Sequence, residues 1–319
     1  MENVSKSILQ KLDTPALLVD WKQVEANVRG MGSLAEEKGV RWMPHIKTHK
    51  SVAIAKMQLE AGAYGLTCAK ISEGRALLPS GVKRLFVAHS VVSPVKIPAL
   101  LELADRLDEL IVAITSIHQA RRLAELLKPT GRVFPCLLAV DTGMGREGSR
   151  NDVELVRMKL FVDGAPSLEY RGIYTHEGFT YTAEPGEIRG EAVRVAQSML
   201  AARGSLGGVG EIWPGCSVTA KEMIGLPGIT GVRPGAYVFA DLFLTQMTGA
   251  MRWEDISLAV AAMVVDKPAP GLALIDAGSK VFSSDRLAEH PFAIPLDGRR
   301  FAVTRLREEH GFLTGEDVD

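Results

Sequence analysis

The sequence has few cysteines, no excess of either charge and no long apolar run, and each absence excludes a class of protein. Its three cysteines, Cys68, Cys136 and Cys216, are far apart and form no CxxC pair, which argues against a disulfide framework or a zinc site. The 37 Lys and Arg residues nearly balance the 38 Asp and Glu residues, so charge favours neither nucleic acid nor an anionic membrane as a partner. No apolar run reaches the length of a membrane span, and the N-terminus lacks the apolar core of a signal peptide. We therefore expect a soluble, cytoplasmic protein.

Short β-rich runs alternate with longer amphipathic stretches from Trp21 to about Tyr237, a pattern typical of parallel strands joined by helices. Asp20 can cap the first helix and Gly39 can end it. The candidate strands are residues 41–44, 65–68, 85–88, 110–114, 133–140, 168–174, 211–213 and 231–233, and the candidate helices between them include 52–59, 97–107, 117–127 and 191–200. We predict an α/β chain with a (β/α)8 barrel over residues 21–247, although an open doubly wound sheet would show similar alternation.

The character of the sequence changes after Asp241. Residues 257–265, 272–275 and 300–303 look like strands separated by turns that contain Pro and Gly. Together with an early strand at residues 16–19, they predict a small β-rich second domain made of residues 1–20 and 248–319.

The first strand is followed by the richest set of polar residues. The segment PHIKTHK places His45, Lys47, His49 and Lys50 directly after residues 41–44, and functional groups of a (β/α)8 barrel lie at such strand ends. A lysine in a partly enclosed barrel mouth has a lowered pKa and can condense with an aldehyde. A solvated basic loop is the alternative, and taken alone it is the commoner reading of such a segment.

Other strand ends carry further candidates. The two glycine-containing turns GCSVT and RPGAYVF can present hydroxyls and backbone N–H groups to a phosphate. The segment DTGMGR places Arg146 on a tight turn, and YTHEGFTY contains His176 and Tyr181. Taken singly, these are equally an ordinary capped turn, an ion-paired arginine and satisfied core groups.

Taken together, these segments resemble those of the D-threonine aldolase and D-serine dehydratase family, whose members are relatives of alanine racemase and bind pyridoxal phosphate (PLP) on a barrel. The matching motifs are DTPA, PHIKTHK, DTGMGR, YTHEGFTY, GCSVT and RPGAYVF, in this order from Asp13 to Phe239.

The resemblance implies a role for each matching residue. Lys47 would hold the cofactor as a Schiff base and move the Cα proton of a D-amino acid, with His176 and Tyr181 as further catalytic candidates. Arg146 would lie near the phenolic oxygen of the cofactor, and Tyr174 near its pyridine ring. The phosphate would be held by Ser217, Val218, Thr219, Gly235 and Tyr237. The expected activity is that of a lyase, either retro-aldol cleavage or dehydration of a β-hydroxy-D-amino acid, in a homodimer.

The sequence departs from the family in its metal site. The family uses a divalent metal that grips the β-hydroxyl, but its His-x-Cys or His-x-Asp ligand pair does not follow Glu309–His310–Gly311 here, and the chain ends at Asp319. We therefore assign no metal ligands and expect an incomplete second domain. An amino-acid racemase, with Lys47 on one face of the substrate and His176 or Tyr181 on the other, and a non-catalytic PLP carrier remain as alternatives.

Overall fold

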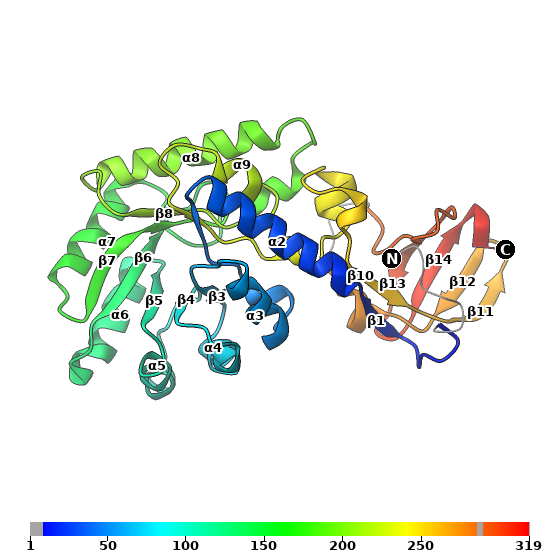
Figure 1. The fold of residues 1–319 in the computed structure, drawn as a ribbon, viewed down its shortest axis with the longest axis horizontal. Helices are drawn as coiled ribbons and strands as arrows, with labels where there is room; N and C mark the ends of the chain where they lie inside the picture. The colour runs from blue at the N-terminus through cyan, green and yellow to red at the C-terminus, as the bar shows by residue number, and fades with distance from the viewer. Residues whose placement is uncertain (1–8, 286–289, 319) are drawn as a thin grey trace.

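The computed structural model describes residues 9–285 and 290–318 of the chain. Figure 1 shows two parts along the long axis of the molecule, a barrel surrounded by helices and an antiparallel sheet that carries the C-terminus. Within the described residues no helix is long and apolar enough to cross a membrane.

Within these residues, eight parallel strands build the barrel. They are β2 (Arg41–Trp42), β3 (Leu66–Cys68), β4 (Arg84–Val87), β5 (Glu109–Ile114), β6 (Phe134–Ala139), β7 (Leu168–Tyr174), β8 (Glu211–Trp213) and β9 (Gly231–Val232). Strands β3 to β8 form one sheet in chain order, and β2 pairs with β9. Backbone hydrogen bonds join these two groups on both sides, from Thr67 N to Pro44 O (2.9 Å) and from Arg233 N to Pro214 O (3.1 Å). The sheet is therefore closed, which confirms the predicted barrel and excludes the open sheet.

Helices cover the outside of the barrel. They are α2 (Trp21–Glu37), α3 (Val52–Glu60), α4 (Ile71–Leu77), α5 (Ile97–Ala104), α6 (Ile117–Leu127), α7 (Asp152–Gly164), α8 (Ile188–Ser205) and α9 (Ala220–Ile224). The Asp20 side chain accepts a hydrogen bond from Gln23 N (3.2 Å) and caps α2, while Gly39 adopts a left-handed φ of 63° just beyond the end of that helix, both as predicted. Helix α5 ends at Ala104, three residues before the predicted end, and the sequence pattern did not identify α4 or α7 as helices.

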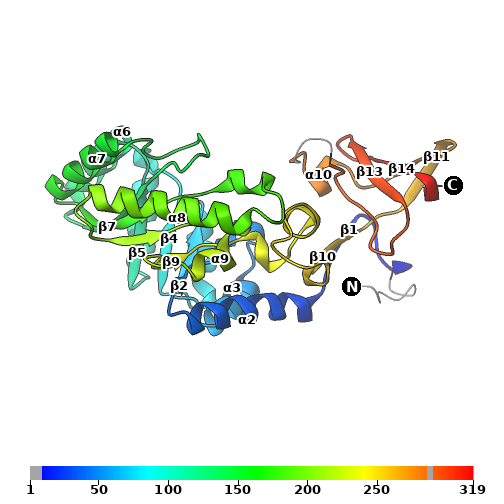
Figure 2. The ribbon, with the colours of Figure 1, turned by 90° about the horizontal axis from the view of Figure 1, so that it is seen from above.

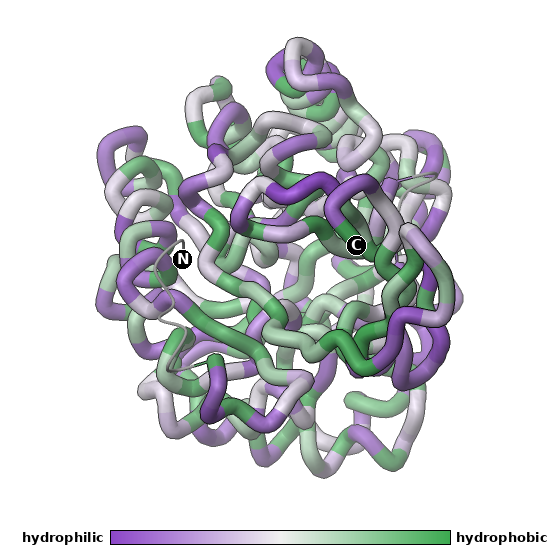
Figure 3. Tube along the Cα trace, turned by 90° about the vertical axis from the view of Figure 1, so that its right-hand side faces the viewer, coloured by the Kyte–Doolittle hydropathy of each residue, from purple (hydrophilic) through white to green (hydrophobic). Residues whose placement is uncertain are grey.

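The apolar core has two layers. Inside the barrel, a cluster that includes Met43, Phe86, Leu137, Tyr174 and Trp213 fills the space between the strands. A larger cluster packs the outer faces of the strands against the helices. Figure 3 shows green, hydrophobic segments toward the middle of the molecule and purple, hydrophilic segments on many of the outer loops. Because Tyr174 belongs to the inner cluster, its ring lies beneath the mouth of the barrel.

The region beyond the barrel is antiparallel. Strand β1 (Ala16–Val19) pairs with β10 (Leu258–Ala261), and a four-stranded sheet has the order β11 (Val264–Ala269), β12 (Leu272–Ile275), β14 (Gly311–Gly315), β13 (Phe301–Leu306). Figure 2 shows β1 and β10 between the barrel and this sheet. The prediction of a single strand over residues 257–265 is wrong, because this run is divided between β10 and β11. The exact domain boundaries stay a prediction.

Candidate functional site

The segment that carries Lys47 is a single 3-10 turn, η1 (Ile46–Thr48), directly after β2. The turn is capped by His45, whose Nδ1 accepts a hydrogen bond from Lys47 N at 3.3 Å. His45 N donates to Pro234 O at 2.9 Å, so the turn is fixed to the loop that follows β9. The lysine therefore lies at the C-terminal end of the barrel strands, as expected.

The Lys47 ammonium group lies in a cationic environment. The side chain is accessible to solvent, but the surrounding protein atoms lower its pKa, first by desolvation and then through the positive charges of Arg146 and Arg233. A lowered pKa increases the fraction of neutral amine at a given pH. Lys47 is thus better suited to attack an aldehyde than an ordinary surface lysine.

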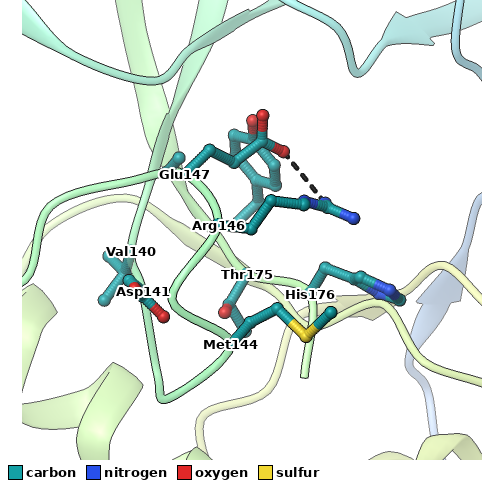
Figure 4. A pocket seen from close by; sticks show the side chains of 9 residues that line it. Val140, Asp141, Met144, Arg146, Glu147, Thr175 and His176 are labelled. Carbon is teal, nitrogen blue, oxygen red and sulfur yellow. Dashed lines mark hydrogen bonds and ion pairs between the residues drawn. The ribbon is translucent and has the colours of Figure 1, made fainter. Parts of the chain in front are cut away.

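Arg146 is presented by the loop between β6 and α7. Asp141 holds this loop, since its carboxylate accepts hydrogen bonds from Gly143 N (3.0 Å) and Gly145 N (3.0 and 3.1 Å). Figure 4 shows the Arg146 and His176 side chains extending in the same direction, with Arg146 bonded to Glu147 at 3.0 Å. The hollow drawn there is lined by residues from this loop and from the end of β7, including Tyr174.

Two buried polar groups lie in the floor of the barrel mouth. The hydroxyl of Tyr174 is buried and has no hydrogen-bond partner among the described residues. Arg233 is only 4% exposed, and its guanidinium donates to the carbonyl oxygens of Thr175 (2.6 Å) and Trp213 (3.4 Å). Among the described residues no carboxylate lies within ion-pair distance of Arg233. A buried cation without an ion-pair partner is costly and leaves donors available to an acceptor that enters the mouth.

His176 is held as a neutral ring. Its Nδ1 lies 2.6 Å from Gly215 O, and because a carbonyl only accepts, Nδ1 carries the proton and Nε2 is left as an acceptor. Desolvation lowers the pKa of His176 to about 4, aided by the charges of Lys47 and Arg146. At neutral pH the ring is therefore a proton acceptor and not a proton donor at Nε2.

The predicted phosphate loops come together. Ser217 Oγ accepts hydrogen bonds from Gly235 N (3.0 Å) and Tyr237 N (3.2 Å), which joins the loop after β8 to the loop after β9. Val218 is also buried in this junction. A Cβ atom at Gly235 would lie 3.1 Å from His45 O, so the glycine permits close approach to the lysine segment. The Thr219 hydroxyl, in contrast, donates a hydrogen bond to the Glu177 carboxylate at 2.8 Å.

Tyr181 lies at the edge of the same region, on the 3-10 turn η5 (Gly178–Thr182). Its ring is half-buried and packs edge-on against Phe243, with ring centroids 6.2 Å apart. Burial raises the pKa of the phenol. The phenol is therefore protonated near neutral pH.

Sequence reasoning assigned no role to Glu177, which proves to be a buried carboxylate between the two loops. It accepts hydrogen bonds from Gly215 N (3.0 Å) and from the Thr219 hydroxyl (2.8 Å), and its exposed fraction is 0%. Burial raises its pKa, while these two donors oppose the rise. The only signal in the sequence is its place between His176 and Gly178 after a strand, which does not distinguish a buried anchor from a reactive group.

No metal ligands emerge among the described residues, where no three His, Cys, Asp or Glu side chains are grouped to hold an ion. His45 and His49 flank the 3-10 turn of Lys47 and do not share a face of an α-helix. The metal therefore stays an expectation from the resemblance.

Comparison with known proteins gives family matches over most of the chain. Residues 19–242 match the model of the alanine racemase N-terminal domain, and residues 257–319 match that of a putative serine dehydratase domain.

Individual relatives match over nearly the whole chain. This chain is 32% identical to D-threo-3-hydroxyaspartate dehydratase of Delftia sp. (strain HT23), and the match covers 97% of this chain and 85% of that protein. It is 28% identical to D-threonine aldolase of Arthrobacter sp., covering 97% and 82% of the two chains. The crystal structure of D-threonine aldolase from Filomicrobium marinum superposes with a TM-score of 0.83 at 30% identity, covering 95% of this chain and 82% of that one.

Proposed function

Since this chain belongs to the alanine racemase N-terminal domain family, within a group that includes D-threonine aldolase and D-threo-3-hydroxyaspartate dehydratase, we propose that it is a PLP-dependent lyase of β-hydroxy-D-amino acids. Both relatives are lyases by name, and both names specify a D-amino acid with a hydroxyl on Cβ. The observation that carries the proposal is the amine of Lys47, with its lowered pKa, at the mouth of the barrel.

The residues around Lys47 fit PLP. The unpartnered hydroxyl of Tyr174 and the free donors of Arg233 suit a polar aromatic ring in the floor of the mouth. The Ser217 hydroxyl accepts from the N–H groups of Gly235 and Tyr237, which leaves its own proton for an acceptor, and a hydroxyl held in this way where two loops meet suits a phosphate. When bound, PLP supplies an aldehyde for amines and an electron sink for the bonds to Cα.

The side chains of this protein then determine which bond of the substrate changes. The Lys47 amine, partly neutral because of desolvation and neighbouring charges, can take up or deliver the Cα proton at Nζ. His176 Nε2 is free to accept a hydrogen bond from the β-hydroxyl, and the bond from its Nδ1 to Gly215 O keeps it in this tautomer. The half-buried phenol of Tyr181 is a neutral donor at the edge of the mouth. Arg146 is a fixed positive charge beside the amine.

Borohydride trapping tests the cofactor assignment. The protein is incubated with PLP, reduced with borohydride and digested, and we expect the label on the peptide that contains Lys47. Lys47→Ala should lose both the label and the activity. The matched control is Lys50→Ala, which removes an exposed lysine three residues away that pairs with Glu73 at 3.2 Å and should keep both. A cofactor-bound protein without label at position 47 contradicts the proposal.

Product analysis tests the reaction. D-Threonine should give glycine and acetaldehyde, or D-serine and D-threo-3-hydroxyaspartate should give keto acids and ammonia, each assayed with and without divalent metals. If the bound protein only exchanges the Cα proton and racemises its substrate, it is a racemase. If it turns over no amino acid, it is a PLP carrier.

Location and assembly are part of the same proposal. The three cysteines are buried and unpaired, which suits the reducing cytoplasm. We place the protein there as a homodimer, and sedimentation that shows only monomer at working concentration would contradict the dimer.

A further inference from the structure

Glu147 brings a carboxylate to the mouth of the barrel, beside Arg146. Its Oε1 accepts a hydrogen bond from Arg146 Nη2 at 3.0 Å, and both residues line the hollow that Tyr174 and His176 also line from the end of β7. Figure 4 shows the ion pair between the two side chains. Within the described parts of the chain, the Glu147 carboxylate has no second hydrogen-bond or ion-pair partner.

The backbone of the loop brings both side chains to the same hollow. The two glycines that flank the pair, Gly145 and Gly148, adopt left-handed φ values of 70° and 101°, which side chains other than hydrogen rarely permit. A Cβ atom at Gly148 would lie 2.9 Å from the carbonyl carbon of Ala139, so the loop closes tightly against the end of β6. Ser149 N donates to Ala139 O at 2.9 Å and completes this closure. The ion pair therefore stands on a fixed base.

Two other carboxylates at the strand ends are turned to donors of the loops themselves. Asp141 lines the same hollow, but its oxygens accept from backbone N–H groups of its own loop. Glu177 is fully buried and accepts from two donors of the loop after β8. Of these three carboxylates, Glu147 is the one whose charge faces a cation that lines the hollow.

The positive charges of the mouth give this carboxylate a task. Desolvation lowers the pKa of Lys47, and the charges of Arg146 and Arg233 lower it further. A group that takes up a proton in one step and delivers it in another works best with a pKa near the operating pH. A carboxylate bound to the Arg146 guanidinium weakens the field of that cation at the amine and so limits the fall. The charge of Glu147 also reaches the floor of the mouth, where it adds to the rise in the pKa of Tyr174 that burial causes.

We propose that Glu147 is a positioning residue that fixes the guanidinium of Arg146 at the mouth and offsets part of its charge, so that Lys47 can hold a proton as well as release it. The inference rests on the proposed function for the role of Lys47, and Glu147 acts through Arg146 and not by contact with the substrate. The charged and titratable groups that face the pair are Asp141 on the same loop, Tyr174 and His176 at the end of β7, Arg233 after β9 and Lys47 after β2.

Titration of Lys47 in the protein without cofactor tests the charge directly. Labelling with acetic anhydride over a pH series, read at Lys47 by tandem mass spectrometry, gives the pH at which this amine loses its proton. Glu147→Gln removes the negative charge and keeps the size of the side chain, so this midpoint should fall by about 0.5–1 pH unit. Glu147→Asp keeps the charge and should restore most of the shift. The side chain is 32% exposed, so both variants should fold.

Glu125→Gln is the matched control. It breaks an exposed pair of the same kind, between Glu125 and Arg122 at 2.8 Å on α6, and should leave the Lys47 midpoint unchanged. A Lys47 midpoint that is the same in Glu147→Gln as in wild type overturns the inference. A midpoint that falls equally in Glu147→Asp shows that the shape of the side chain and not its charge is responsible, and it overturns the inference as well.

The bound cofactor supplies a second readout. The visible absorption of the PLP-loaded protein changes with pH when the nitrogen that joins PLP to Lys47 loses its proton. This midpoint should also fall in Glu147→Gln and stay near the wild-type value in Glu147→Asp and in Glu125→Gln. If wild type binds no PLP, the proposed function is wrong, while the titration of Lys47 still decides whether Glu147 sets the charge at this amine. If wild type is labelled at Lys47 by PLP and borohydride but neither midpoint responds to Glu147→Gln, only the inference is wrong.

Discussion

Removing the buried carboxylate of Glu177 should damage the site indirectly, through the loop after β8 that carries the predicted phosphate-binding residues Ser217 and Thr219. Glu177 accepts one hydrogen bond from Gly215 N and one from the Thr219 hydroxyl, at 3.0 and 2.8 Å. These donors belong to the loop that also carries Ser217, which in turn accepts from Gly235 and Tyr237. Glu177→Ala leaves both donors without an acceptor inside the protein.

The expected loss follows from these two bonds. Each buried donor without an acceptor costs about 1–3 kcal/mol, so Glu177→Ala should lower the free energy of unfolding by about 2–6 kcal/mol. Glu177→Gln keeps the shape of the side chain and one acceptor, but its amide nitrogen faces a second donor, and the expected loss is about 1–3 kcal/mol. The surface control Glu60→Gln, whose ion pair with Lys56 is exposed, should change little.

The pH dependence has a defined sign. Burial raises the pKa of Glu177 above its usual range, so the folded protein holds this proton more tightly than the unfolded chain. The resulting stability is present below the unfolded pKa of about 4.3 and is lost as the pH rises through the folded pKa. The advantage of wild type over Glu177→Gln should therefore narrow as the pH rises. Urea denaturation of both proteins from pH 4 upward measures this difference.

Two results would refute this reasoning. If Glu177→Gln is as stable as wild type at every pH, the carboxylate does not hold the loop. If the advantage of wild type grows with pH, the carboxylate is stabilised in its charged form and the pKa argument is wrong. A Glu177→Gln protein that folds normally but binds PLP more weakly would assign the carboxylate a role in holding the phosphate loop.

Two further predictions concern stability. A Cβ atom at Gly231 would overlap the fully buried ring of Trp213, so Gly231→Ala should lower the free energy of unfolding by at least about 1–3 kcal/mol. The control is Gly30→Ala on the exposed face of α2, where the new Cβ meets no atom. This variant should raise the free energy of unfolding by about 0.5–1 kcal/mol. The pKa of His176 lies at about 4 in the fold against 6.5 in the unfolded chain, so stability should fall by roughly 3 kcal/mol as the pH decreases from 6.5 to 4, and His176→Gln should flatten that fall. Urea denaturation measures the free energy of unfolding for both predictions. A Gly231→Ala protein as stable as wild type would contradict the first. A His176→Gln protein that loses as much stability as wild type between pH 6.5 and 4 would contradict the second.

Much of the barrel could be predicted because its strands are short and its turns are marked. All eight strands lie within two residues of the predicted bounds at either end, since an apolar run followed by polar residues is a local signal. The alternation alone could not exclude an open sheet, because closure depends on bonds between separate strand ends, such as Arg233 N to Pro214 O.

The tail shows the limit of local patterns more clearly. Residues 257–265 form one apolar run in the sequence, yet β10 pairs with β1 while β11 pairs with β12. The change between them occurs at Met263, whose N–H donates to the Asp276 carboxylate at 2.8 Å. Strand β12 follows β11 closely, but β1 lies near the other end of the chain, so no window around residue 263 contains the pairing of β10.

The site divides in the same way. Lys47, Arg146 and His176 each follow a strand, and the common end of parallel strands brings them to one mouth, so their grouping follows from position alone. What position does not reveal is burial. Glu177 is adjacent to His176, but only the packed fold shows that its carboxylate is enclosed and occupied by Gly215 and Thr219.

Gly231 shows how a residue acquires its meaning from packing. An acidic side chain at this position, two residues before Arg233, could pair with the guanidinium, but the sequence has a glycine here. Instead, the ring of Trp213 occupies the space that a side chain at position 231 would need, and Arg233 is held by carbonyl oxygens of Thr175 and Trp213. Carbonyls fix the guanidinium without neutralising it, so its charge continues to lower the pKa of Lys47. A carboxylate paired with Arg233 would cancel that charge, and the glycine therefore favours the reactive form of the amine on which the proposed chemistry depends.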